Sequence, residues 1–329
     1  MKKPTESKIP PSMEAPAGMH TLFADCRDTR TVSYLPDVVY ATRDGIDLHL
    51  QMLYPGSVPM GIMFEKLKKE HPEMAAGDGP FAGRKPEPAE KNPLIIYVQG
   101  SAWFKQDCYR NLPALVDFAR MGYVVASVEY RPSPVAPWPA FLQDVKAAIR
   151  YLRANADLFG VDPERVGVWG DSSGGHTALL VGSTGWTREF DDDLCPDQSS
   201  AVRCVVDFYG LSDITKLTHF PRDPENQQYD KTQPEDVLFR TRVLDHPEVA
   251  APANPIAYIH PDKDYPPFLI FHGDGDGTVP FNQSVLMYEK LVAEGKQVDF
   301  YKVKGAGHGV RMWTPEVLDV VAQFFRAYL

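Results

Sequence analysis

Short apolar runs alternate with segments of helical period over the last two-thirds of the chain. Leu94–Val98 is a continuous apolar run, which is typical of a strand buried on both faces of a parallel sheet. Residues 138–157 give the clearest helical pattern, with apolar side chains at three- and four-residue spacing. The pattern predicts further strands at 123–128, 165–169, 204–208, 268–271 and 298–303, and further helices at 110–120, 281–294 and from Thr314 onward, where Pro315 follows the N-cap. This alternation predicts an α/β fold, a mostly parallel, eight-stranded sheet with helices on both faces.

The first third of the chain follows a different pattern. Residues 37–42 and 46–54 predict two strands joined by a turn at Asp44-Gly45. Residues 1–36 are rich in Pro, Met and charge and predict an N-terminal arm, which leaves 37–329 as one domain. Residues 55–92 predict a long insertion with one short amphipathic helix near 60–67. Because the second strand is expected to run antiparallel, this insertion should begin at the sheet edge away from the ligand-binding edge.

The charge balance restricts the partners. The 329 residues carry a formal net charge of −10, and no long Lys/Arg run is present, so neither nucleic acid nor an anionic membrane is an expected partner. Polar, Pro-rich residues follow Met1-Lys2-Lys3, where a signal peptide would have an apolar segment. No run approaches the ~18 apolar residues of a membrane span. We expect a cytoplasmic protein unless a signal peptide has been removed, and the sequence leaves a homo-oligomer open.

No metal or cofactor is expected. The four cysteines, Cys26, Cys108, Cys195 and Cys204, form no CxxC pair of the kind that binds zinc. Cys195 and Cys204 flank a short polar loop and could form a disulfide, but free thiols are favoured in a cytoplasmic protein. Asp274-Gly-Asp276-Gly resembles the start of a calcium loop, yet position 285, where the closing Glu belongs, is Val.

The strongest chemical signal is G-x-S-x-G at residues 170–174, between a predicted strand and a predicted helix. This is the context of the nucleophile elbow of α/β-hydrolases, with Ser172 as the nucleophile. The turn is so tight that Gly170 and Gly174 are needed on either side. The helix that follows favours developing negative charge at its N-terminus, and the Ser173 amide is a candidate oxyanion donor.

A serine nucleophile needs a base and an acid that orients the base. His308 lies in Gly305-Ala-Gly-His-Gly, a loop after a predicted strand, whereas His272 and His176 are more typical of structural histidines. Asp276 follows another strand directly, with Asp274 as its rival. The order Ser172, Asp276, His308 along the chain is the one this fold uses.

The sequence resembles the bacterial bifunctional acetylxylan/feruloyl esterases, which are related to the hormone-sensitive-lipase-like carboxylesterases. The resemblance covers residues 94 to 329 and is carried by Tyr130-Arg131, the stretch 139–156, Phe159-Gly-Val-Asp-Pro163, the stretch 166–176, Asp207-Phe-Tyr-Gly210 and Pro266-Pro-Phe-Leu-Ile-Phe-His-Gly273. It implies a serine carboxylesterase with Ser172, Asp276 and His308 as its triad. It also implies that Asp144 pairs with Arg131.

The resemblance further implies an oxyanion loop, in which Ser101 and Ala102 supply backbone amides beside that of Ser173. Here the chain departs from the family, because Gln99-Gly-Ser-Ala-Trp103 replaces the usual His-Gly-Gly-Gly-Trp. Amide donors do not require glycine if φ is negative, so the loop can function without these glycines.

The substrate pocket is expected to be shaped by a small cap over about 209–255. More than 50 residues separate the strand ending at Phe208 from the next strand, far more than one helix and its connections need. Trp103 and Tyr209 are the candidate pocket residues, and Phe220, Tyr229, Phe239 and Arg240 give the cap a half-polar character. Because a continuous apolar face is lacking, we expect small-molecule esters and not long-chain lipids as substrates.

Two other functions fit parts of this pattern. A prolyl-oligopeptidase-type peptidase shares the catalytic domain, but the chain has no room for the large gating domain that such peptidases usually carry. A non-catalytic binding protein of the same fold typically lacks the serine or the histidine, and here both are present.

Overall fold

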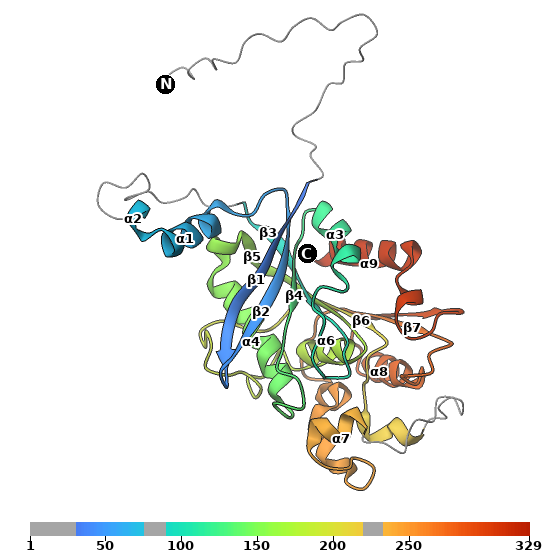
Figure 1. Ribbon diagram of the computed structural model, residues 1–329. Helices are drawn as coiled ribbons and strands as arrows, with labels where there is room; N and C mark the ends of the chain where they lie inside the picture. Colours follow the sequence, from blue (N-terminus) through green and yellow to red (C-terminus); the bar gives the residue numbers. More distant parts are fainter. Residues whose placement is uncertain (1–30, 76–89, 220–232) are drawn as a thin grey trace, which may run out of the picture. The chain divides into compact units, whose positions relative to one another are not determined.

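The computed structural model describes residues 31–75, 90–219 and 233–329 (Figure 1). Its eight strands form one sheet in the order β1-β2-β4-β3-β5-β6-β7-β8. The strands are β1 (Val32–Arg43), β2 (Ile46–Pro55), β3 (Asn92–Val98), β4 (Val124–Val128), β5 (Val161–Asp171), β6 (Cys204–Phe208), β7 (Phe268–Gly273) and β8 (Val298–Val303). β2 pairs antiparallel with β1 and β4, and every other pair is parallel. The predicted mostly parallel sheet is confirmed.

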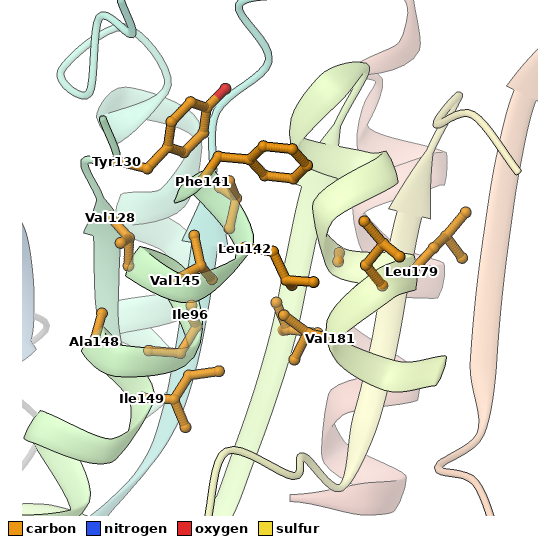
Figure 2. Close-up of a cluster of buried hydrophobic side chains, with 14 of the residues drawn as sticks. Ile96, Val128, Tyr130, Phe141, Leu142, Val145, Ala148, Ile149, Leu179 and Val181 are labelled. Carbon is orange, nitrogen blue, oxygen red and sulfur yellow. The ribbon is translucent and has the colours of Figure 1, made fainter. Parts of the chain in front are cut away.

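Helices cover both faces of the sheet. One face packs against α3 (Leu112–Arg120) and α9 (Pro315–Tyr328), and the other against α4 (Ala140–Ala154), α6 (Ser173–Ser183) and α8 (Asn282–Ala293). Figure 2 shows the second face, where side chains of α4 and α6 meet Ile96 and Val128 from the strands. Successive strand residues point to opposite faces, so each strand contributes to both apolar clusters. Because β3 to β8 run parallel, their carboxyl ends lie at one edge of the sheet.

The predicted start of β1 is wrong by five residues, because residues 32–36 belong to the strand and not to an arm. The β1–β2 register shifts between Leu35 and Val38, where Asp37 has φ 52°. A bulge of this kind breaks the two-residue alternation that marks a strand in the sequence. Residues 1–30 of the predicted arm lie outside the described residues.

The insertion at 55–92 contains the predicted helix, α1 (Met60–Glu70), followed by the short α2 (Pro72–Ala75). α1 packs against α5 (Ala156–Phe159). In Figure 1, α1 and the cap helix α7 (Pro234–Phe239) lie at opposite ends of the view. The described part of the insertion is therefore not a lid over the carboxyl ends of the strands. The rest of it, residues 76–89, lies outside the described residues.

The connection between β6 and β7, where the cap is predicted, contains several short helices. They are η1 (Ile214–His219), α7, η3 (Pro247–Ala253) and η4 (Pro255–Tyr258). Phe220 and Tyr229, both predicted in the cap, lie outside the described residues. A last short turn, η5 (Val310–Met312), leads from β8 to α9, whose N-cap Thr314 accepts the Val317 amide as predicted.

Three of the four cysteines lie in the described ranges. Cys108, Cys195 and Cys204 are all free thiols, so the disulfide alternative between the last two is wrong. None of the described helices is long and apolar enough to cross a membrane.

Candidate active site

Ser172 occupies the sharp turn between β5 and α6. Its backbone has φ 54° and ψ −123°, a conformation that L-residues rarely adopt. A Cβ on Gly170 would lie 2.1 Å from the Gly174 carbonyl oxygen, and one on Gly174 would lie 1.9 Å from the Val98 oxygen. Only glycine fits at either position. The two glycines thus permit the turn that places Ser172 at the N-terminus of α6.

The structure brings Ser172, His308 and Asp276 into one line. His308 Nε2 lies 2.9 Å from Ser172 Oγ, and His308 Nδ1 lies 2.8 Å from Asp276 Oδ2. An ionised carboxylate only accepts hydrogen bonds, so Nδ1 carries the proton and Nε2 accepts from the serine hydroxyl. This tautomer is the one in which a histidine can act as a general base.

Asp276 is held by further donors. Its Oδ1 accepts the amides of Thr278 at 2.8 Å and Val279 at 2.9 Å, and His272 Nε2 lies 3.4 Å from Oδ2. Burial alone would raise the pKa of Asp276, but hydrogen bonds from His272 and His308 hold that pKa well below its usual range. The carboxylate therefore stays ionised beside His308. The rival, Asp274, is exposed and instead accepts the Gly305 amide at 2.6 Å.

The loop after β3 meets Ser172 and Ser173 at the same edge. The Ser101 amide donates to Ser173 Oγ at 2.9 Å, so this predicted oxyanion donor is already engaged. The amides of Ala102 and Ser173 donate to no acceptor among the residues that the structure describes. Two of the three predicted amides are therefore available to an oxyanion.

The condition of negative φ is not met at Ala102. Ala102 has φ 52° and Trp103 has φ 59°, the left-handed region that disfavours residues with a Cβ by ~1–2 kcal/mol each. Hydrogen bonds hold the loop in this shape, since the Ser133 amide donates to the Trp103 carbonyl at 2.8 Å and Ser101 Oγ donates to the Phe104 carbonyl at 2.7 Å. These two hydrogen bonds stabilise a backbone conformation that glycines would adopt without strain.

Asp171 was not singled out from the sequence, although it directly precedes Ser172. It is buried, and its Oδ1 accepts the Tyr97 hydroxyl at 2.5 Å and the Gly100 amide at 3.0 Å. It therefore ties the loop after β3 to the elbow. Its position next to Ser172 in the sequence could have marked it as a residue of the site.

A cavity of about 110 Å³ opens at Ser172. Its lining comes from the loop after β3, the elbow, the cap and the segment after Asp276: Ala102, Trp103, Ser172, Ser173, Leu211, Leu217, Gln233, Pro234, Glu235, Thr278 and Val279. Trp103 is a wall residue, as predicted. The cap contributes through Leu211, Leu217 and the start of α7.

Tyr209 is not part of this wall, which corrects the prediction. It is fully buried, and its ring packs on His308 with the ring centroids 4.5 Å apart. Tyr209 directly follows β6, and its ring packs against the His308 ring instead of lining the cavity. The sequence placed it at the correct edge but could not give the direction of its side chain.

The predicted pair of Arg131 and Asp144 is present behind the site. Asp144 is fully buried and accepts the Arg131 amide at 2.9 Å, while the guanidinium contacts both carboxylate oxygens. Arg131 follows Tyr130, whose hydroxyl lies 3.0 Å from Ser101 Oγ. The ion pair thus supports the strand end against which the oxyanion loop packs.

We expect Asp144→Asn to lower the free energy of unfolding by about 2 kcal/mol, because the fully buried, charged acceptor of the Arg131 amide and guanidinium is lost and Arg131 keeps only the exposed Asp44 as an ionic partner. Urea denaturation measures this effect. Asp245→Asn is the matched control, since Asp245 also pairs with an arginine but is exposed. Equal effects of the two substitutions would contradict this account.

Comparison with known proteins assigns the family. The sequence model of the BD-FAE family matches residues 84–291, more than half of the chain. The chain belongs to the BD-FAE family. Among curated proteins, this BD-FAE chain is 34% identical to "Esterase LipC" of Mycobacterium tuberculosis over 228 residues, 69% of this chain and 55% of LipC. It is 32% identical to "Esterase LipQ" of the same organism over 212 residues, 61% of this chain and 46% of LipQ.

Solved structures agree with the BD-FAE assignment. A "truncated form of carbohydrate esterase from gut microbiota" is 26% identical, with a TM-score of 0.69, over 90% of this chain and 95% of that chain. These matches and the observed sheet identify the α/β-hydrolase fold. The chain spans about half the length of the curated relatives it matches.

Proposed function

We propose that this protein is a serine carboxylesterase that hydrolyses small acyl esters through an acyl-enzyme intermediate. The observation that carries the proposal is the hydrogen-bonded line from Asp276 through His308 to Ser172 at the mouth of a cavity. Such a line activates a hydroxyl that is otherwise a weak nucleophile. Neither the peptidase alternative nor the binding-protein alternative is favoured by a specific observation.

The proposed steps follow from the positions of the donors and acceptors. Ser172 Oγ attacks the ester carbonyl carbon while His308 Nε2 takes its proton, and Asp276 stabilises the resulting imidazolium. The amides of Ala102 and Ser173 stabilise the oxyanion, helped by the N-terminus of α6. His308 returns the proton to the departing alcohol. In the second half, His308 Nε2 takes a proton from a water molecule, which attacks the acyl carbon. His308 then returns this proton to Ser172 Oγ as the carboxylic acid is released.

The cavity supports small acyl groups as substrates. Its volume of about 110 Å³ is below the ~300–1,000 Å³ of pockets that enclose drug-sized ligands. Trp103, Leu211, Leu217 and Val279 give it an apolar part, and Gln233, Glu235 and Thr278 a polar part. The resemblance to a carbohydrate esterase makes acetylated sugars the first natural substrates to test, beside methyl ferulate.

We expect acetyl to butyryl p-nitrophenyl esters to give the highest kcat/KM, with a steep fall by the octanoyl ester. Leu217→Ala should shift this profile toward longer chains, because it enlarges the apolar part of the cavity. Leu244→Ala is the matched control, since Leu244 lies in the same cap but is 56% exposed and does not line the cavity. The measurement is kcat/KM for the acetyl, butyryl and octanoyl esters, with a dipeptide amide as the test of peptidase activity.

An optimum at decanoyl or longer esters in the wild type would overturn the proposed substrate class. Faster turnover of the dipeptide amide than of any ester would favour the peptidase. An unchanged chain-length profile in Leu217→Ala would show that this cap residue does not limit the length of the acyl group.

A further inference from the structure

His176 is a buried histidine that the catalytic steps above do not use. It lies on α6, one turn after Ser172, and its side chain is fully buried without lining the cavity. Trp103 Nε1 lies 3.2 Å from His176 Nδ1, and His176 Nε2 lies 2.7 Å from the Ala253 carbonyl oxygen. The imidazole therefore bridges the oxyanion loop and the end of η3 in the cap.

The chemistry of the partners fixes the form of the ring. An indole N–H only donates and a carbonyl oxygen only accepts, so Nδ1 must be bare and Nε2 must carry the proton. Burial lowers the pKa of His176 to about 4, which keeps the ring in this neutral form at neutral pH. Both hydrogen bonds are then made at once and have a fixed direction.

Each end of the bridge leads to a wall of the cavity. Trp103 lines the cavity directly and follows Ala102, whose amide is a proposed oxyanion donor. Beyond Ala253, Asn254 Oδ1 accepts the Ile214 amide at 2.8 Å, and η3 packs against η1, whose Leu217 is another residue of the cavity lining. One buried side chain thus contacts the oxyanion loop directly and is connected to Leu217 of the cavity lining through η3 and η1.

The oxyanion loop has a particular need for such a contact. Ala102 and Trp103 both have positive φ, which their side chains disfavour, so the loop keeps this shape only while its surroundings hold it. The hydrogen bond from the Trp103 indole and its edge-on packing on His176, with centroids 5.3 Å apart, restrain the second of these residues.

We propose that His176 is a positioning residue that couples the oxyanion loop to the cap, and so affects both the rate of acyl transfer and the acyl length that the cavity accepts. The inference rests on the proposed esterase function and deepens it. His176 does not touch the substrate. It acts through Trp103 on the Ala102 amide and through η3 on the wall that contains Leu217.

The test compares three substitutions at one position. Gln can accept from Trp103 and donate to Ala253 together, whereas Asn is one methylene too short to reach both, and Leu reaches neither. We expect His176→Leu and His176→Asn to lower kcat for the acetyl ester by about 10²-fold, the scale for a displacement of about 1 Å at a catalytic group. His176→Gln should stay at least ~10-fold above both. The ratio of kcat/KM between butyryl and octanoyl esters should fall in the same two variants.

Two further measurements separate coupling from a merely structural role. The double variant Trp103→Phe/His176→Leu should be no slower than the slower single variant, since both changes remove the same hydrogen bond. Hydrogen exchange should quicken in both residues 99–106 and residues 247–258 of His176→Asn, and in neither segment of His176→Gln. His246→Leu, an exposed histidine of the cap, is the control.

The outcomes are distinct from those of the proposed function. Absence of ester hydrolysis in the wild type would refute the esterase, while the exchange data would still decide whether the bridge exists. Variants that lose thermal stability but keep kcat, acyl preference and exchange in the two segments would overturn the coupling. Equal behaviour of the Gln and Asn variants would overturn it as well.

Discussion

Ser172→Ala is expected to lower kcat for an acetyl ester by about 10⁶-fold, the loss seen when a triad nucleophile is removed. The hydroxyl that His308 Nε2 faces at 2.9 Å is the only group removed, and the turn is formed by the backbone and by Gly170 and Gly174. The fold should therefore persist, with an unchanged melting temperature. The measurement is p-nitrophenyl acetate hydrolysis beside a thermal unfolding curve.

Ser183→Ala is the matched control for this substitution. Ser183 is a buried serine at the other end of α6, so its loss tests the helix without touching the elbow. A Ser172→Ala enzyme that kept a tenth of the wild-type rate would refute the assignment of the nucleophile.

The second large effect is expected at Asp276. Asp276→Asn should lower kcat by about 10⁴-fold, because an amide favours the wrong tautomer of His308 and cannot stabilise its charged form. The present carboxylate accepts from His308 Nδ1 at 2.8 Å and is kept ionised by its donors. The measurement is kcat for the acetyl ester at neutral pH.

Asp274→Asn provides the internal comparison, since Asp274 lies two residues away and contacts the Gly305 amide instead of His308. We expect Asp274→Asn to lower kcat far less than Asp276→Asn does. If the two variants ranked in the opposite order, the acid of the site would be Asp274 and the proposed line of hydrogen bonds would be wrong.

Much of the fold follows from local patterns in the sequence. Buried strands such as Leu94–Val98 are continuous apolar runs, and helices such as α4 show their period and their ends, so most elements were predicted within a few residues. The meeting of Ser172, Asp276 and His308 was also predictable. Each follows a parallel strand, and the carboxyl ends of such strands lie at one edge.

Features that depend on contacts between distant segments could not be predicted. The bulge at Asp37 hid the first residues of β1, because the alternation that marks a strand stops there. The positive φ of Ala102 and Trp103 is held in part by hydrogen bonds that link Trp103 to Ser133 and His176, which lie far along the chain. No local pattern contains that information.

Side-chain direction was the other missing quantity. Tyr209 was placed at the correct sheet edge, but its ring packs under His308. The Ser101 amide was predicted as an oxyanion donor, yet the Ser173 hydroxyl occupies it. In both cases the backbone position followed from topology, whereas the hydrogen-bond partner depended on packing around the site.

Trapping of the acyl-enzyme is the most direct test of the proposed mechanism. The enzyme is mixed with p-nitrophenyl acetate, quenched in acid during the first turnover, and analysed by intact-protein and peptide mass spectrometry. We expect one acetyl group per chain, located on the peptide that contains Ser172 and absent from Ser172→Ala. An acetyl group at another residue, or rapid ester hydrolysis by the Ser172→Ala enzyme without any adduct, would contradict the account.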